Sequence, residues 1–207
     1  MSFEDLIYED WKWRERELAN LKAITLSTQP GTPQRSVMLR AMWAILYAHY
    51  EGFFKFTWDC ILSHLDSLSL NRSDLLDSLE VLSLEEDIKQ CKKKLTNQEF
   101  LAFCKSFTET YSSPVKFVKK LETNSNLYPS VIDDNNAILN LELTSLEDIR
   151  HHLKALVSRR NAIAHGQVMI IKDLDDYTKY ENAVFTVIND FVLSCIDYIN
   201  NNKYIKQ

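Results

Sequence analysis

Glycine and proline are scarce in this chain, and this scarcity limits the folds open to it more than any other feature. The 207 residues include 3 glycines and 4 prolines. Tight β-hairpins and phosphate-binding loops need these residues at fixed positions. Gly31, Gly52 and Gly166 lie too far apart to form a P-loop or a dinucleotide-binding fingerprint. We therefore expect long helices and exclude those two classes of enzyme.

Length, composition and charge indicate one folded domain, expected to cover residues 1–207. Apolar residues make up 45% of the chain and charged residues 26%, as in globular proteins, and we find no internal repeat. The net charge of −5 argues against nucleic-acid binding over the whole surface, so any such binding must be local. The 4 cysteines form no CxxC pair and the N-terminus resembles no signal peptide, which favours the reducing cytoplasm. Charged residues interrupt the apolar stretch 41–58, so we expect no membrane insertion.

Apolar residues recur at helical spacing in four long stretches. These predict helices over about 3–26, 34–67, 145–165 and 175–201. The second helix is apolar on nearly every side, as the central helix of a bundle would be. Thr144 followed by Glu147 is a capping-box pattern at the start of the third helix, and Gly166 is a suitable stop for it.

The middle of the chain is less regular. We predict shorter helices over 75–94, 97–111 and 114–121. Residues 124–140 include Pro129 and the polar run 133–136, which predict an irregular, exposed excursion. The short run 168–171 suits either a strand or an extended linker. Together these patterns predict an all-α bundle.

One segment stands apart for its chemistry. Arg159, Arg160, Asn161 and His165 lie within seven residues near a helix end, and Asn161 and His165 share a helix face at i, i+4. A guanidinium can clamp a phosphate, while an imidazole can move the proton of a ribose 2′-hydroxyl or of a leaving group. The set therefore suits RNA cleavage without a metal. The alternative is structural: the arginines act as last-turn cations and His165 as a C-terminal cap.

Two motifs in the chain resemble the HEPN superfamily. Arg160 to His165 resembles its signature of Arg, four to six residues and His, and residues 39–53, with Ala48-His49-Tyr50-Glu51-Gly52, resemble the second helix of one prokaryotic branch. The resemblance implies an all-α bundle of four to five main helices with short extra helices. It also implies a dimer in which both Arg/His motifs face a shared cleft. Many members are metal-independent endoribonucleases of toxin–antitoxin or antiphage systems that leave a 2′,3′-cyclic phosphate.

Residue by residue, the resemblance assigns Arg160 and His165 as the catalytic pair and Asn161 as the supporting polar residue. Glu51 matches an acidic residue of the second helix that would orient His165 or Arg160. A competing role for Glu51 is an ion pair with Lys55 at i+4. Arg159 also meets the looser spacing, and we assign it to substrate binding. We interpret His49 as structural, and the aromatic residues Trp43, Phe53, Phe54 and Trp58 as core or dimer interface rather than base-stacking residues.

The sequence therefore predicts a cytoplasmic hydrolase, a homodimeric endoribonuclease that uses no metal or cofactor. Its expected partners are RNA and a cognate antitoxin or other protein. The alternative is a non-catalytic HEPN module that binds a nucleotide or a partner protein. Two lysine runs, 92–94 and Lys116, Lys119 and Lys120, suit a solvated helix face more than an RNA path.

Overall fold

The computed structural model describes residues 1–118, 120–169 and 171–206. Within these ranges the chain forms eight α-helices and one short 3-10 helix, with no β-strand, so the predicted all-α class is confirmed. The helices are α1 (Phe3–Ser27), α2 (Pro33–Ser67), α3 (Asp77–Ser83), α4 (Glu85–Cys91), α5 (Asn97–Ser112), α6 (Pro129–Leu139), α7 (Leu146–Ala164) and α8 (Leu174–Asn200), and the 3-10 helix covers Arg72–Asp74. The run 168–171 has no assigned element at its described positions, and Ile170 lies outside them.

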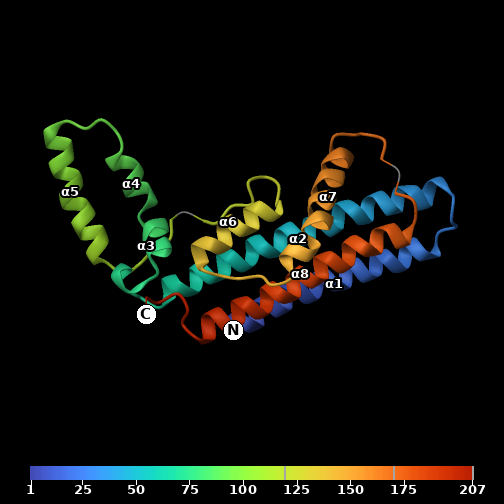
Figure 1. The fold of residues 1–207 in the computed structure, drawn as a ribbon, viewed down its shortest axis with the longest axis horizontal. Helices are drawn as coiled ribbons and strands as arrows, with labels where there is room; N and C mark the ends of the chain where they lie inside the picture. The colour runs from blue at the N-terminus through green and yellow to red at the C-terminus, as the bar shows by residue number, and fades with distance from the viewer. Residues whose placement is uncertain (119, 170, 207) are drawn as a thin grey trace.

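Helices α1, α2 and α8 run along the long axis of the molecule, and α7 crosses them (Figure 1). α2 contacts all three of these helices and forms the centre of the core. Its aromatic side chains Trp43, Phe53, Phe54 and Trp58 are fully buried, which confirms them as core residues. Phe54 stacks on Phe191 of α8 with ring centroids 4.2 Å apart. Burial of each such ring stabilises the fold by about 1.5–3 kcal/mol.

The interface between α1 and α2 contains an ion pair packed against a glycine. Arg14 of α1 binds Asp10 at 2.7 Å, and both side chains are nearly buried. A Cβ atom at Gly52 would lie 2.8 Å from the Arg14 guanidinium, so glycine leaves room for this close approach. Nearby, Nε2 of the buried His49 lies 2.6 Å from the Glu17 carboxylate. His49 and Gly52 therefore join α2 to α1, which agrees with a structural role for His49.

Two helix predictions in the middle of the chain are wrong. Residues 114–118 and 120–121 are not helical, because tertiary hydrogen bonds hold the segment extended. The Val115 N–H donates to the Leu70 carbonyl (2.8 Å), and the Phe117 N–H donates to the Asp66 carboxylate (3.0 Å). The predicted helix over 75–94 is also interrupted, since Leu84 leaves helical geometry between α3 and α4.

The prediction of an exposed, irregular excursion over residues 124–140 is also wrong, because α6 occupies most of it. Of the polar run 133–136, Asp133 and Asp134 are exposed, but Asn135 and Asn136 are buried and have partners. The indole N–H of Trp58 donates to Asn136 Oδ1 (3.3 Å), and the Asn135 amide donates to the Glu122 carbonyl (2.9 Å). Hydrogen-bonded amides can be buried at little cost, so a polar run does not guarantee a surface loop.

α7 begins where predicted, but it is capped by a residue distant in sequence. The backbone N–H and the hydroxyl of Ser145 donate to Asp190 of α8, at 2.8 and 2.7 Å. Ser145 is the N-cap without a local side-chain cap, so the predicted capping box of Thr144 and Glu147 does not form. The first turn of α7 is therefore attached directly to α8.

α8 is long and apolar enough to span a membrane by length and composition alone. Core helices of soluble proteins meet the same criterion. The buried side chains of α8 recur at helical spacing, among them Val184, Val187, Ile188 and Phe191, and the helix packs against α2 and α7. This burial pattern is that of a core helix.

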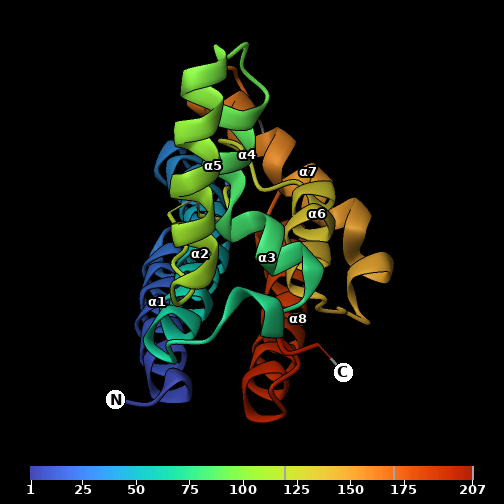
Figure 2. The same ribbon diagram turned by 90° about the vertical axis from the view of Figure 1, so that its left-hand side faces the viewer.

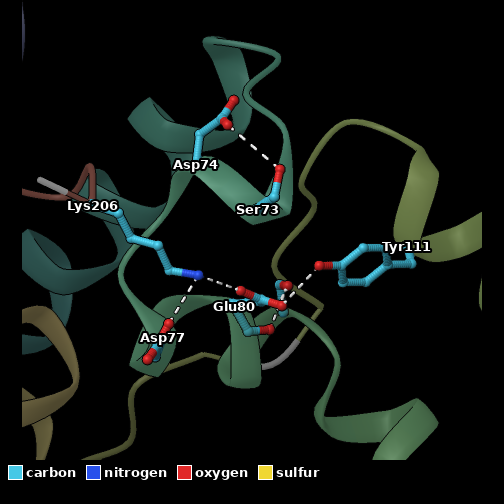
Figure 3. A network of polar contacts seen from close by, with 7 residues as sticks. Ser73, Asp74, Asp77, Glu80, Tyr111 and Lys206 are labelled. Carbon is cyan, nitrogen blue, oxygen red and sulfur yellow. Dashed lines mark hydrogen bonds and ion pairs between the residues drawn. The ribbon is translucent and has the colours of Figure 1, made fainter.

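α4 and α5 rise away from the three long helices, which leaves α5 largely exposed (Figures 1 and 2). Arg72, only 3% exposed, secures the C-terminal end of α5 by donating to the carbonyls of Thr110 and Ser113, both at 2.6 Å. Figure 3 shows a second attachment, in which Glu80 of α3 accepts from the Tyr111 hydroxyl (3.2 Å) and the Lys206 ammonium group (2.8 Å).

We predict that Arg72→Ala detaches α5 from the bundle. A hydrogen bond from a charged donor contributes about 1.5–3 kcal/mol, so two such bonds suggest a loss of about 3 kcal/mol in unfolding free energy. Urea unfolding measures this loss, and hydrogen exchange should quicken in residues 97–112. Arg150→Ala is the control, because its ion pair with Asp133 is partly exposed and should contribute at most about 1 kcal/mol. Equal losses for the two variants would contradict the prediction.

Burial of His49 also predicts how stability changes with pH. Desolvation lowers the pKa of His49 below its ordinary value of 6.5, although Glu17 acts in the opposite direction. The folded state then binds a proton less readily than the unfolded state, so stability is full above about pH 6.5 and falls as the pH drops. We expect a smaller decline in urea-derived stability between pH 7 and 5 for His49→Gln. Burial lowers the pKa of His152 as well, so part of the slope should remain. A wild type that becomes more stable over that range would disprove this assignment.

Candidate functional site

The C-terminal end of α7 carries the Arg/His motif. α7 ends at Ala164, His165 is the C-cap, and Gly166 adopts a φ of +72° that favours glycine. The N–H groups of Gly166 and Gln167 donate back to the carbonyls of Ile163 (3.1 Å) and Ala162 (2.9 Å). The predicted stop at Gly166 is confirmed, and it leaves His165 exposed at the end of the helix.

Arg160 lies against α2, where two side chains hold its guanidinium. The guanidinium carbon is 3.8 Å from the centroid of the Tyr47 ring, and Nη2 is 3.7 Å from Glu51 Oε2. Tyr47 and Glu51 are separated by one helical turn, so they present neighbouring surfaces to Arg160. The side chains of Arg160 and Glu51 are each 23% exposed, so the pair is partly covered rather than sealed in the core.

The contacts of Arg160 leave part of its hydrogen-bonding capacity unused. Arg160 Nε and Glu51 Oε1 are both buried and have no hydrogen-bond partner among the described residues. A guanidinium has five N–H donors, and the ion pair and the ring contact do not saturate them. An oxyanion that reaches this position would therefore find a cation already oriented by two neighbours.

Tyr47 remains a neutral phenol in this setting. Burial raises the pKa of Tyr47 to about 12, and the carboxylate of Glu51 adds to this, whereas Arg160 and the Leu127 N–H act to lower it. A neutral ring keeps its π face available for the guanidinium, an interaction of about 0.5–2 kcal/mol.

Glu51 faces Arg160, while Lys55 has a different partner. Lys55 Nζ lies 3.7 Å from Glu122 Oε2, and no contact within ion-pair distance links it to Glu51 in the described part of the chain. Of the two arrangements considered from the sequence, the structure contains the one in which Glu51 contacts Arg160. The side chain of Glu51 makes no described contact with His165.

Asn161 and His165 are connected through the backbone only. The His165 N–H donates to the Asn161 carbonyl at 2.9 Å, as the helix ends. Within the described residues, the half-buried Asn161 amide makes no hydrogen bond to the exposed imidazole. The helix face that Asn161 and His165 share therefore produces no side-chain contact between them in the single chain.

Arg159 points to a different side of α7 and is engaged in packing. Its guanidinium binds Asp176 at 3.0 Å and lies over the adjacent rings of Trp43 (4.8 Å) and Tyr180 (5.0 Å). Adjacent helical residues diverge by about 100°, which separates Arg159 from Arg160. Arg159 thus joins α7 to α2 and α8, and this geometry does not favour its predicted use in substrate binding.

Sequence reasoning missed Tyr47 and the segment beside it. The Tyr47 hydroxyl accepts from the Leu127 N–H (2.8 Å), and the Tyr50 hydroxyl donates to the Leu127 carbonyl (3.1 Å). The spacing of Tyr47 and Glu51 at i, i+4 on α2 was the available signal, but it does not reveal the position of Leu127. Of the lysine run in this segment, Lys120 pairs with Asp59 (3.2 Å), and Lys119 lies outside the described residues.

The described residues contain no group of three or more His, Cys, Asp or Glu side chains placed to hold a metal ion. A hollow of about 400 Å³ between α6 and α7 is lined by Asp133, Glu142, Glu147 and Arg150 among others. Its three carboxylates make it a poor site for a phosphate. The Arg/His motif is better suited to an anion than this hollow is.

Comparison with known proteins agrees with this architecture. A family model described as MAE_28990-like HEPN matches residues 3–204. No curated protein and no solved structure matches the chain. Because the family model spans nearly the whole all-α bundle, including α2 and the Arg160–His165 motif, the chain belongs to the HEPN superfamily.

Proposed function

We propose that this protein is a metal-independent endoribonuclease that acts as a homodimer. In this proposal Arg160 binds the scissile phosphate and stabilises the charge that develops on it, and His165 transfers the proton of the 2′-hydroxyl or of the leaving group. The ribose 2′-oxygen attacks the adjacent phosphorus, the 5′-oxygen of the next nucleotide leaves with a proton, and a 2′,3′-cyclic phosphate remains. Asn161 supports the pair and Glu51 orients Arg160.

The position of Arg160 is the observation that carries the proposal. Its guanidinium is oriented by Tyr47 and Glu51, and its side chain is still 23% exposed, so that part of it is open to a phosphate. His165 follows at the exposed end of the same helix and has no side-chain partner among the described residues. A second copy of the chain would bring another Arg160 and His165 to this end of α7, which is how we propose that the cleft is completed.

The ion pair between Arg160 and Glu51 also favours a second candidate, a non-catalytic HEPN module. An arginine whose charge is offset within its own chain can serve packing or bind a nucleotide without cleaving it. Such a module would bind a nucleotide or a partner protein at the same end of α7.

The cellular role is likewise a proposal. An endoribonuclease of this family suits a toxin–antitoxin or antiphage system in the cytoplasm, controlled by a cognate antitoxin or another partner protein. The substrate-binding role predicted for Arg159 from the sequence is tested by comparing cleavage by Arg159→Ala with cleavage by Asp176→Ala, which removes only the ion-pair partner.

We expect wild-type protein to cleave total RNA in excess chelator, and we expect Arg160→Ala and His165→Ala to abolish this cleavage. Removing one group that stabilises the transition-state charge typically costs about 100- to 1,000-fold in rate. Fragment ends are mapped for a 2′,3′-cyclic phosphate, and circular dichroism confirms that each variant folds. Equal residual cleavage by all three proteins would identify a contaminant and contradict the proposal. RNA or nucleotide binding without cleavage would support the non-catalytic module.

Glu51→Gln should lower the cleavage rate without unfolding the protein. A partly exposed ion pair contributes up to about 1 kcal/mol, which corresponds to roughly a fivefold loss of rate. Glu122→Gln is a matched control, because it removes another α2 ion pair of 3.7 Å that does not involve Arg160. The same kcat for Glu51→Gln as for wild type would exclude a role for Glu51 in orienting Arg160.

A further inference from the structure

Tyr47 makes contact with two parts of the molecule that are far apart in sequence. It is 2% exposed on α2, its ring lies 3.8 Å from the Arg160 guanidinium carbon, and its hydroxyl accepts from the Leu127 N–H at 2.8 Å. One rigid side chain therefore links α7 to the segment that precedes α6. Burial alone would not require either contact, since a leucine could also fill a core position.

The segment from Lys120 to Tyr128 lies along α2 in the opposite direction to the helix. Its contacts with α2 occur in reverse order: Lys120 with Asp59 (3.2 Å), Glu122 with Lys55 (3.7 Å), and Leu127 with Tyr50 and Tyr47 (3.1 and 2.8 Å). In Figure 1 this segment rises as a loop just before α6, on the side of α6 that faces α7. The segment is thus fixed to α2 next to the site of Arg160.

The contact between Tyr47 and Arg160 restricts how the guanidinium can turn. A planar guanidinium held on the face of a ring directs its N–H donors outward along its own plane. Glu51 Oε2 lies 3.7 Å from Nη2, one of the nitrogens that carry these donors. The ring and the carboxylate together select an orientation, whereas the carboxylate alone would leave the plane free to tilt.

We propose that Tyr47 is a positioning residue for Arg160, and that its hydroxyl makes the segment Thr123–Tyr128 part of the same site. The ring orients the guanidinium toward the scissile phosphate, and the hydroxyl holds the Leu127 backbone beside the same side chain. The kinetic part of this inference rests on the proposed ribonuclease function. The structural part concerns only Tyr47, Arg160 and Leu127.

Three variants separate these roles. Tyr47→Phe keeps the ring and removes the hydroxyl, Tyr47→Leu removes both, and Tyr198→Leu is the control. Tyr198 of α8 is equally buried, packs against Tyr204, and its hydroxyl has no partner among the described residues. Both leucine variants remove a buried ring from the core. Tyr47→Leu also leaves the Leu127 N–H without its acceptor, and only Tyr47→Leu removes the ring beneath Arg160.

The first measurement is kcat and KM on a short single-stranded RNA of mixed sequence that carries a fluorophore and a quencher. We expect Tyr47→Leu to lose about 2- to 30-fold in kcat, the range that a cation–π contact represents. Tyr47→Phe should restore most of that kcat, and Tyr198→Leu should keep it. If Tyr47→Leu and Tyr198→Leu have the same kcat, Tyr47 does not position the reacting groups.

The second measurement is independent of activity. In protein labelled with ¹⁵N-arginine, the Arg160 Nε–H signal, assigned with Arg160→Lys, should be shifted by the ring in wild type and in Tyr47→Phe but not in Tyr47→Leu. The Leu127 amide should exchange faster in Tyr47→Phe because its acceptor is gone. An Arg160 signal unaffected by Tyr47→Leu would overturn the inference. If wild type cleaves no RNA while these spectral changes occur, the ribonuclease proposal fails and the positioning of Arg160 by Tyr47 stands.

Discussion

The fold depends on the need to cover a 35-residue helix that is apolar on nearly every side. α2 buries side chains along its whole length, from Leu39 to Leu65, and no single neighbour can shield them all. α1, α7 and α8 each pack against it. α6 contacts it at Trp58, whose indole N–H donates a hydrogen bond to Asn136. Because the core surrounds much of α2, polar residues in the middle of this helix contact its neighbours.

Consecutive residues in the middle of α2 contact different neighbours. His49 and Gly52 meet Glu17 and Arg14 of α1, whereas Tyr50 binds the Leu127 carbonyl. Glu51 faces Arg160 of α7. Successive residues of a helix point about 100° apart, so a short run of α2 can contact α1, α7 and the backbone at Leu127. The candidate site is therefore part of the packing of the bundle rather than a separate addition to its surface.

The sequence predicted correctly those features that depend on residues close together in the chain, and it failed where the partners are distant in sequence. The long helices and the stop at Gly166 were predictable, because apolar periodicity and a left-handed glycine act locally. α6 was missed because the amides of Asn135 and Asn136 find partners on segments distant in sequence. The helix predicted after Pro114 does not form for the same reason, since the N–H groups of this segment donate to Leu70 and Asp66. Distant partners of this kind leave no local pattern in the sequence.

By itself, the sequence determined the all-α class, the central position of α2 and the presence of two arginines and a histidine at the end of one helix. Only the tertiary structure distinguished the two arginines. Arg159 lies over Trp43 and Tyr180 and pairs with Asp176, while Arg160 lies over Tyr47 beside Glu51. Both have the same side chain and nearly the same distance to His165 along the chain. Neighbouring positions on α7 point about 100° apart, so the two side chains face different directions. Which contacts each one makes depends on how α2 and α8 pack against α7.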